Sequence, residues 1–200
     1  MLDDLRHRVR THQPLSLPRT QAFPEAAVLM PVTCGCEPGL ILTQRAMNLS
    51  THGGEVAFPG GRRDPGDASL AFTALRESEE EVGLAPSLVE VVGPLSPQVS
   101  RYGIKVTPYV GLVPEAVPLQ ANQDEIAAVF SVPLAFFRTD PREVTHRIDY
   151  LGVSHYVPSY RWEGFHIWGL TALMIVELVN VLYDAGIDLR HPPADFRILR

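Results

Sequence analysis

Cysteine is scarce in this sequence of 200 residues, because only Cys34 and Cys36 occur and a single residue separates them. A disulfide across so short a spacing would be strained, and two thiols are too few ligands for a zinc site. The sequence therefore argues against a disulfide scaffold and against structural zinc. It indicates reduced thiols in an intracellular protein.

Long apolar runs are also lacking. The most apolar tract, residues 167–183, is interrupted by Glu177 and Asn180. It is shorter than the roughly 20 residues that a membrane-spanning helix needs. The first seven residues contain no apolar stretch of the kind found in signal peptides. We therefore expect a cytoplasmic protein with no membrane partner.

Positive charge is in deficit. The chain has 23 acidic and 17 basic residues, and its formal net charge is −6. Proteins that bind nucleic acids normally carry a basic surface, so we expect no nucleic-acid partner. An acidic protein that acts on an anionic substrate would need local positive charge, usually from a bound cation.

The composition is otherwise that of an ordinary globular protein, with 46% hydrophobic and 20% charged residues. Short apolar runs of strand length occur at residues 26–32, 40–44, 55–58, 88–92, 104–113 and 126–132, followed by a β-rich stretch at residues 144–166. Helical patterns occupy the N-terminus, residues 67–82 and residues 169–184. Helices packed on a mixed sheet are the simplest architecture for this order of elements.

The length of the chain fits a single domain. We expect an N-terminal helix and a proline-punctuated arm in residues 1–24, a core in residues 25–186 and a C-terminal tail in residues 187–200.

The second predicted helix carries an unusual concentration of acid at its C-terminal end. Glu79, Glu80 and Glu81 precede Gly83, which we expect to end the helix, and acids at that end cost about 0.3–1 kcal/mol each. Glu77, Glu80 and Glu81 also lie at spacings where like charges cost about 0.2–0.5 kcal/mol per pair. The cluster is either a solvated acidic patch or a set of ligands for a divalent cation.

The faces of this helix can be assigned from its pattern. We expect a buried face made of Ala71, Leu75, Ser78 and Val82. The carboxylates of Glu77, Glu80 and Glu81 should converge on a different face. Asp67 precedes the helical pattern, and we interpret it as the N-cap.

Residues 53–84 resemble the Nudix box, in which a glycine, a spacer and an acid precede an Arg-Glu-aliphatic-x-Glu-Glu-x-Gly-aliphatic end. The residues that match this end are Arg76, Glu77, Glu80, Glu81, Gly83 and Leu84. Ser78 stands where an aliphatic residue is usual, and the spacing from Gly61 to Arg76 is one residue longer than in the general box. Asp67 lies near the place of the first glutamate of the box, but we assign it no metal role.

This resemblance implies a Nudix hydrolase, an α+β protein with a three-layer α/β/α sandwich around a mixed sheet, which cleaves a diphosphate with Mg²⁺ or Mn²⁺. Glu77 and Glu81 are the strongest metal-ligand candidates, with Glu80 beside them. Arg76 is expected to orient a glutamate through a bidentate pair. The general base that accepts the proton from water would be Glu77, Glu81 or Glu125. Glu125 lies in a polar loop before a strand, and the roles of an extra metal ligand or a plain surface residue also stay open for it.

Residues 42–61 resemble the additional signature of the coenzyme A diphosphatase branch of the family. The matching residues are Arg45, His52, Gly54, Glu55, Val56, Phe58, Pro59, Gly60 and Gly61. The longer spacer and residues 100–103 and 167–172 are also similar to members of this branch. The resemblance implies hydrolysis of coenzyme A, or of its derivatives, to 3′,5′-ADP and (acyl-)4′-phosphopantetheine.

The substrate-binding residues expected from this resemblance are Arg45, His52, Phe58, Gly60, Gly61 and Arg62. Simpler interpretations stay open, because His52 can be an ordinary hydrogen-bonded histidine, the arginines can be surface charges and the glycines can form a turn. Two other functions also stay open: hydrolysis of another nucleotide diphosphate such as ADP-ribose or a dinucleotide, and a non-catalytic nucleotide-binding module. The sequence leaves the number of metal ions and the oligomeric state undetermined.

Overall fold

Two parallel strands form the centre of the main sheet in the computed structural model of the protein. β1 (Glu25–Cys34) pairs with β7 (Lys105–Pro114) over its full length. β2 (Gly39–Arg45) follows β1 as its antiparallel hairpin partner. The structure describes residues 2–17, 20–49, 52–150, 153–193 and 198–199. Parts of the predicted arm (18–19), tail (194–197 and 200) and coenzyme A diphosphatase-like segment (50–51) lie outside these described residues.

Within the described residues, the main sheet has eight strands in the order β3-β2-β1-β7-β5, with β4 on β1, β6 on β7 and β8 on β2. Its other strands run antiparallel to their neighbours: β3 (Val56–Ala57), β4 (Gly60–Arg62), β5 (Glu90–Pro94), β6 (Gln98–Val99) and β8 (Ile126–Pro133). Each strand-length apolar run of the sequence falls on one of these strands. β4 was not predicted, because Gly60 and Gly61 indicate a turn when only local sequence is considered.

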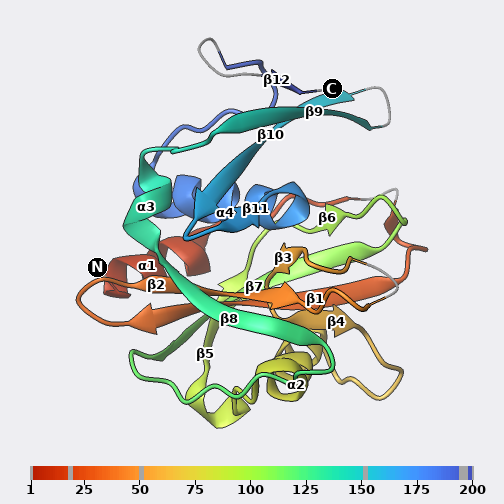
Figure 1. Ribbon diagram of the computed structural model, residues 1–200, viewed down its shortest axis with the longest axis vertical. Coiled ribbons are helices and arrows are strands. Elements are labelled where there is room, and N and C mark those ends of the chain that lie inside the picture. The colour runs from red at the N-terminus through yellow and green to blue at the C-terminus, as the bar shows by residue number, and fades with distance from the viewer. Residues whose placement is uncertain (1, 18–19, 50–51, 151–152, 194–197, 200) are drawn as a thin grey trace.

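Helices cover both faces of this sheet (Figure 1). α2 (Leu70–Val82) lies on one face, and α1 (Leu2–Thr11) and α4 (Gly169–Tyr183) lie on the other. Successive side chains of β1 point to opposite faces of the sheet, so this strand contributes to a hydrophobic core on each face. Leu29 packs toward α2, whereas Met30 and Val32 pack in the cluster that includes α1 and α4. The predicted α+β class, with helices on a mixed sheet, is confirmed.

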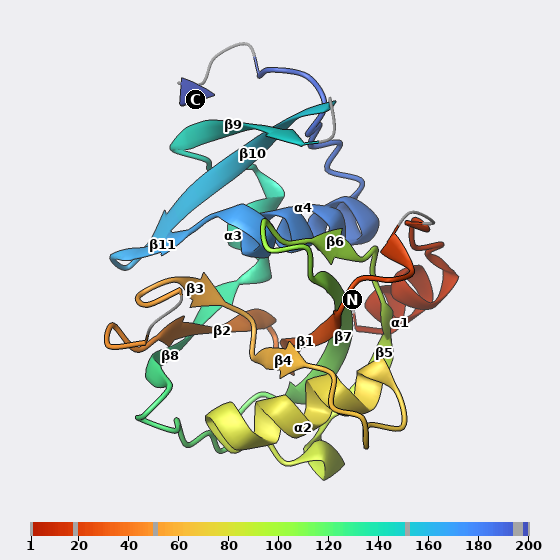
Figure 2. The same ribbon diagram turned by 90° about the vertical axis from the view of Figure 1, so that its right-hand side faces the viewer.

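A second, smaller sheet lies beyond α4 and adds a layer to the predicted sandwich (Figure 2). It consists of β9 (Val144–Tyr150), β10 (Val153–Trp162), β11 (Phe165–Ile167) and β12 (Ile198–Leu199). Two short helices also occur: α3 (Leu134–Arg138), which follows β8, and a 3-10 turn, η2 (Pro86–Leu88), after α2. Tyr160 is fully buried against Phe137, and its hydroxyl donates to Asp140 at 3.2 Å.

α4 joins the two sheets. Thr171, near its beginning, donates a 2.9 Å hydrogen bond to the Val56 carbonyl of β3, and its apolar side chains fill the larger core. Among the described residues, no helix has the length and apolar character that crossing a bilayer requires.

Candidate functional site

α2 begins and ends at defined capping residues. Ser69 is the N-cap, and its hydroxyl accepts the backbone N–H of Phe72 at 3.1 Å. Gly83 ends the helix in the left-handed region (φ 67°), and its N–H donates to the Glu79 carbonyl at 2.9 Å. The predicted end is confirmed, but the predicted start is wrong, because the N-cap is Ser69, two residues after Asp67.

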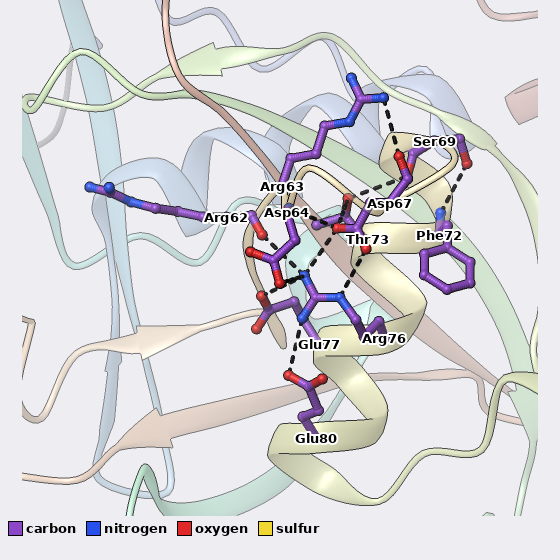
Figure 3. Close-up of polar contacts among 10 residues, drawn as sticks. All are labelled: Arg62, Arg63, Asp64, Asp67, Ser69, Phe72, Thr73, Arg76, Glu77 and Glu80. Carbon is purple, nitrogen blue, oxygen red and sulfur yellow. Dashed lines mark hydrogen bonds and ion pairs between the residues drawn. The ribbon is translucent and has the colours of Figure 1, made fainter.

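Asp67 instead forms a buried ion pair with Arg76 (Figure 3). The carboxylate accepts Arg76 Nε and Nη2, each at 3.0 Å, the Thr73 hydroxyl at 2.8 Å and the Asp64 N–H at 3.0 Å. Only 6% of Asp67 is exposed. The guanidinium, helped by the other donors, holds the pKa of Asp67 well below its usual range. The bidentate partner of Arg76 is therefore Asp67, and our prediction of a glutamate in that place is wrong.

The remaining contacts of Arg76 reach the predicted metal ligands (Figure 3). Nη2 lies 3.1 Å from Glu77 Oε1, and Nη1 donates to Glu80 Oε2 at 3.1 Å. Nη2 also donates to the Arg62 carbonyl of β4 at 3.2 Å. One guanidinium thus joins the turn before α2, the carboxylates of α2 and the neighbouring strand.

Glu81 is buried, with 4% of its surface exposed. Its Oε2 accepts the Gly60 N–H at 3.1 Å, and its Oε1 accepts Arg45 Nη1 at 3.3 Å. Burial, which outweighs these two contacts, raises the pKa of Glu81 to about 7.

The buried face of α2 differs from the predicted one. It comprises Thr73, Ala74, Ser78, Glu81 and Val82, while the expected Ala71 and Leu75 are half-buried. Glu81 therefore belongs to the face that packs on the sheet, and only Glu80 among the three glutamates is largely open to solvent, with 57% of its side chain exposed.

The two glycines of β4 allow the carboxylates to approach the backbone. A Cβ atom at Gly61 would overlap the carboxylate of Glu77, and one at Gly60, where φ is 155°, would overlap the backbone of β1. Only glycine therefore permits the close approach of Gly61 to the Glu77 carboxylate and of Gly60 to the backbone of β1. Glu77 is consequently half-buried, and burial raises its pKa.

Of the other predicted site residues, two lie near Glu81, one lies at the surface and one lies in the core. Arg45 reaches the buried Glu81, and Glu125 is close enough for its charge to raise the pKa of Glu81. Arg62 is exposed, and its side chain extends away from the ion-pair cluster (Figure 3). Phe58 is only 3% exposed and belongs to the larger core, so its position is that of a packing residue.

His52 lies on the loop before β3, and it has partners of its own. Its Nδ1 is 2.7 Å from Glu55 Oε2, and its ring meets that of Tyr102 edge to face. Sequence reasoning identified neither this contact nor the role of Asp67. The only local signal for Asp67 was its position near the first acid of the box.

The donor set of this site fits a divalent cation. Glu77 and Glu81 lie one helical turn apart and supply carboxylate oxygens, which Mg²⁺ and similar ions prefer. A buried carboxylate such as Glu81 gains most from a cation, because its charge is otherwise poorly solvated. Among the described residues, no three or more Asp, Glu, His or Cys side chains form a group that could hold a metal ion by itself. Further positions would be filled by water and phosphate oxygens.

Comparisons with known proteins identify the family of this chain. The NUDIX domain family model matches residues 24–148. Proteins named "Uncharacterized Nudix hydrolase NudL" are 44% identical: one from Shigella sonnei over 182 residues (89% of this chain and 93% of that protein), and one from Escherichia coli over 181 residues (88% and 92%). The crystal structure of a Nudix hydrolase from Alicyclobacillus acidocaldarius shares the fold, with a TM-score of 0.51 at 17% identity over 85% of this chain and 98% of that chain.

The chain therefore belongs to the Nudix family and is a Nudix pyrophosphohydrolase. Nudix hydrolases use divalent metal ions and act on small nucleotide-type substrates. The oxygen-donor set on α2 suits such an ion.

We expect Asp67→Asn to destabilise the protein in a pH-dependent manner. The folded-state pKa of Asp67 lies below its unfolded value of about 4, so its stabilisation is complete above pH 4 and is lost as the pH falls through the folded-state pKa. At pH 7 the variant should unfold roughly 10 °C below the wild type, because Arg76 loses its main partner. The difference should narrow as the pH falls from about 4 to 2.

The control for this experiment is Asp64→Asn. Asp64 lies 3.7 Å from Arg76 Nη2 and 68% of its side chain is exposed. The Tm of the Asp64→Asn variant should therefore stay close to that of the wild type. A Tm difference for Asp67→Asn that stays constant down to pH 2 would contradict the assignment.

We expect Gly61→Ala to impair catalysis with little loss of stability. The added methyl group must displace the Glu77 carboxylate, which is the far end of a flexible side chain. A displaced ligand should reduce kcat/KM for diphosphate hydrolysis by about 10- to 100-fold. Gly66→Ala is the matched control, since a Cβ atom there meets nothing within 4 Å. Equal activity of the two variants would argue against a role in catalysis for the close approach between Gly61 and Glu77.

Proposed function

We propose that this protein hydrolyses the diphosphate of coenzyme A, or of its derivatives, with Mg²⁺ or Mn²⁺, and releases 3′,5′-ADP and (acyl-)4′-phosphopantetheine. One observation carries the proposal. The segment that resembles the coenzyme A diphosphatase signature meets the glutamates of the Nudix box, since Arg45 and Gly60 both donate hydrogen bonds to Glu81.

Each group of the site has a proposed task. Glu77 and Glu81 would hold the cation, and Glu80 would contribute from the more exposed side of the helix. When bound, the cation supplies positive charge against the diphosphate and lowers the pKa of water. Arg76 positions the glutamates and is itself held by Asp67.

The reaction requires water to attack one phosphorus atom while the bridging P–O bond breaks and the other phosphate leaves. A carboxylate accepts the proton from water. Glu125 is the proposed base, because it lies near Glu81 without being committed to Arg76. The exposed guanidinium of Arg62 and the side chain of Arg45 provide positive charge for phosphate oxygens.

A substrate panel tests the assignment. The protein should release 3′,5′-ADP from coenzyme A when Mg²⁺ or Mn²⁺ is present, and chelation should abolish the release. Acetyl-coenzyme A, oxidised coenzyme A, ADP-ribose and dinucleoside polyphosphates complete the panel, with products separated by chromatography. Cleavage of ADP-ribose or a dinucleotide with coenzyme A left intact would move the protein to another substrate class. Nucleotide binding without turnover would indicate a non-catalytic module.

We expect Glu77→Gln and Glu81→Gln each to reduce kcat by at least about 100-fold, because each removes a charged oxygen ligand. Glu79→Gln is the matched control, since Glu79 is an exposed acid in the same part of α2. Its kcat should be within about twofold of the wild type. Circular dichroism and thermal unfolding establish that each variant is folded. Near-normal turnover in both glutamine variants would remove the metal-site assignment.

A further inference from the structure

An exposed tyrosine stands at the tip of the turn between β6 and β7. Tyr102 is 55% exposed, yet the turn that carries it is tightly bonded. Backbone hydrogen bonds of 2.9 Å run from Ser100 N to the Ile104 carbonyl and from Gly103 N to the Ser100 carbonyl. The Ser100 hydroxyl also accepts the N–H groups of Tyr102 and Ile104. The aromatic ring is therefore presented to solvent by an ordered turn.

Two side chains hold the ring from different directions. The guanidinium carbon of Arg101 lies 4.8 Å from the ring centroid, and Arg101 Nη2 donates to the tyrosine hydroxyl at 2.8 Å. His52, from the loop before β3, meets the ring edge to face with centroids 5.4 Å apart. His52 is held in turn by Glu55 at 2.7 Å. The ring is thus fixed in position while much of its surface stays open.

This ring is connected to the carboxylates through β2 and β3. The carbonyl of Glu55 accepts the backbone N–H of Arg45 at 3.0 Å, and the side chain of Arg45 reaches Glu81. The contact between His52 and Tyr102 therefore brings the β6–β7 turn to a loop that begins after Arg45, the residue whose side chain pairs with Glu81. In Figure 2, β3, β4 and β6 lie on the side that faces the viewer.

The register of the main sheet gives the distance between β4, which lies beside the carboxylates, and β6, which precedes the Tyr102 turn. Arg62 of β4 pairs with Ala26 of β1, Ala26 with Val106 of β7, and Val106 with Gln98 of β6. Three strand spacings separate Arg62 from Gln98, which amounts to roughly 14 Å. The Tyr102 turn follows directly after β6. A nucleotide with its diphosphate near β4 can extend across such a span toward Tyr102.

We propose that Tyr102, held by Arg101 and His52, stacks on the base of the nucleotide half of the substrate. Through this contact the protein selects its substrate by the nucleotide half and not by the pantetheine half. The proposal rests on the proposed function, since it extends the same site. An aromatic ring offers a stacking face to a base, and such stacking strengthens binding by roughly 5- to 150-fold per base. Arg101 adds positive charge beside the ring, which favours an anionic nucleotide over a neutral ligand.

Steady-state kinetics with coenzyme A tests this role. Tyr102→Ala should raise KM by about 10-fold with kcat within about twofold of the wild type, because stacking serves binding and not bond cleavage. Tyr102→Phe retains the ring and should stay near the wild-type KM. Phe72→Ala is the matched control, since it removes another exposed ring, 48% exposed, from α2. An unchanged KM in Tyr102→Ala would overturn the proposal.

Product inhibition identifies which half of the substrate the ring contacts. Tyr102→Ala should raise the inhibition constant of 3′,5′-ADP by the same factor as KM and leave that of 4′-phosphopantetheine unchanged. The reverse pattern would overturn the proposal, because it would place the pantetheine half on the ring.

The stacking role of Tyr102 can also be tested separately from hydrolysis of coenzyme A. If the wild type leaves coenzyme A intact, calorimetric titration of AMP into the wild type and Tyr102→Ala still tests the stacking role. Weaker AMP binding by Tyr102→Ala supports the role, and equal binding overturns it.

Discussion

The buried ion pair between Asp67 and Arg76 is the interaction on which the site depends. Asp67 lies in the turn before α2 and Arg76 in the middle of that helix, so their two parallel contacts fix the turn against the helix. The same guanidinium then reaches Glu77, Glu80 and the backbone of β4. Loss of this pair would release the helix, its carboxylates and the adjoining strand from one another.

The carboxylates held in this way are in unfavourable surroundings. Glu81 is buried and Glu77 half-buried, and in both cases burial raises the pKa of the carboxyl group. A fold selected for stability alone would place neutral residues at these positions. Their presence opposite two glycines that admit close approach supports our proposal that a cation and a phosphate bind here.

Arg45 and Glu55 connect the carboxylates of α2 to the neighbouring loop. Arg45 pairs with Glu81 through its side chain and with Glu55 through its backbone, and Glu55 holds His52. The site is therefore continuous from α2 to the loop before β3, and the edge-to-face contact of His52 extends it to Tyr102. In our proposal, the loop region governs substrate selectivity, whereas α2 supplies the metal-binding carboxylates for bond cleavage.

The acidic helix end, its terminating Gly83, most strands and the family could be predicted from the sequence, because each is encoded in residues close together along the chain. Tertiary structure decided the partner of Arg76, the burial of Glu81, the strand at Gly60 and the core position of Phe58. These depend on contacts between segments far apart in sequence, such as Gly60 with Glu81 or His52 with Tyr102. Local patterns carry no information about which distant backbone or charge will fill the space beside a side chain.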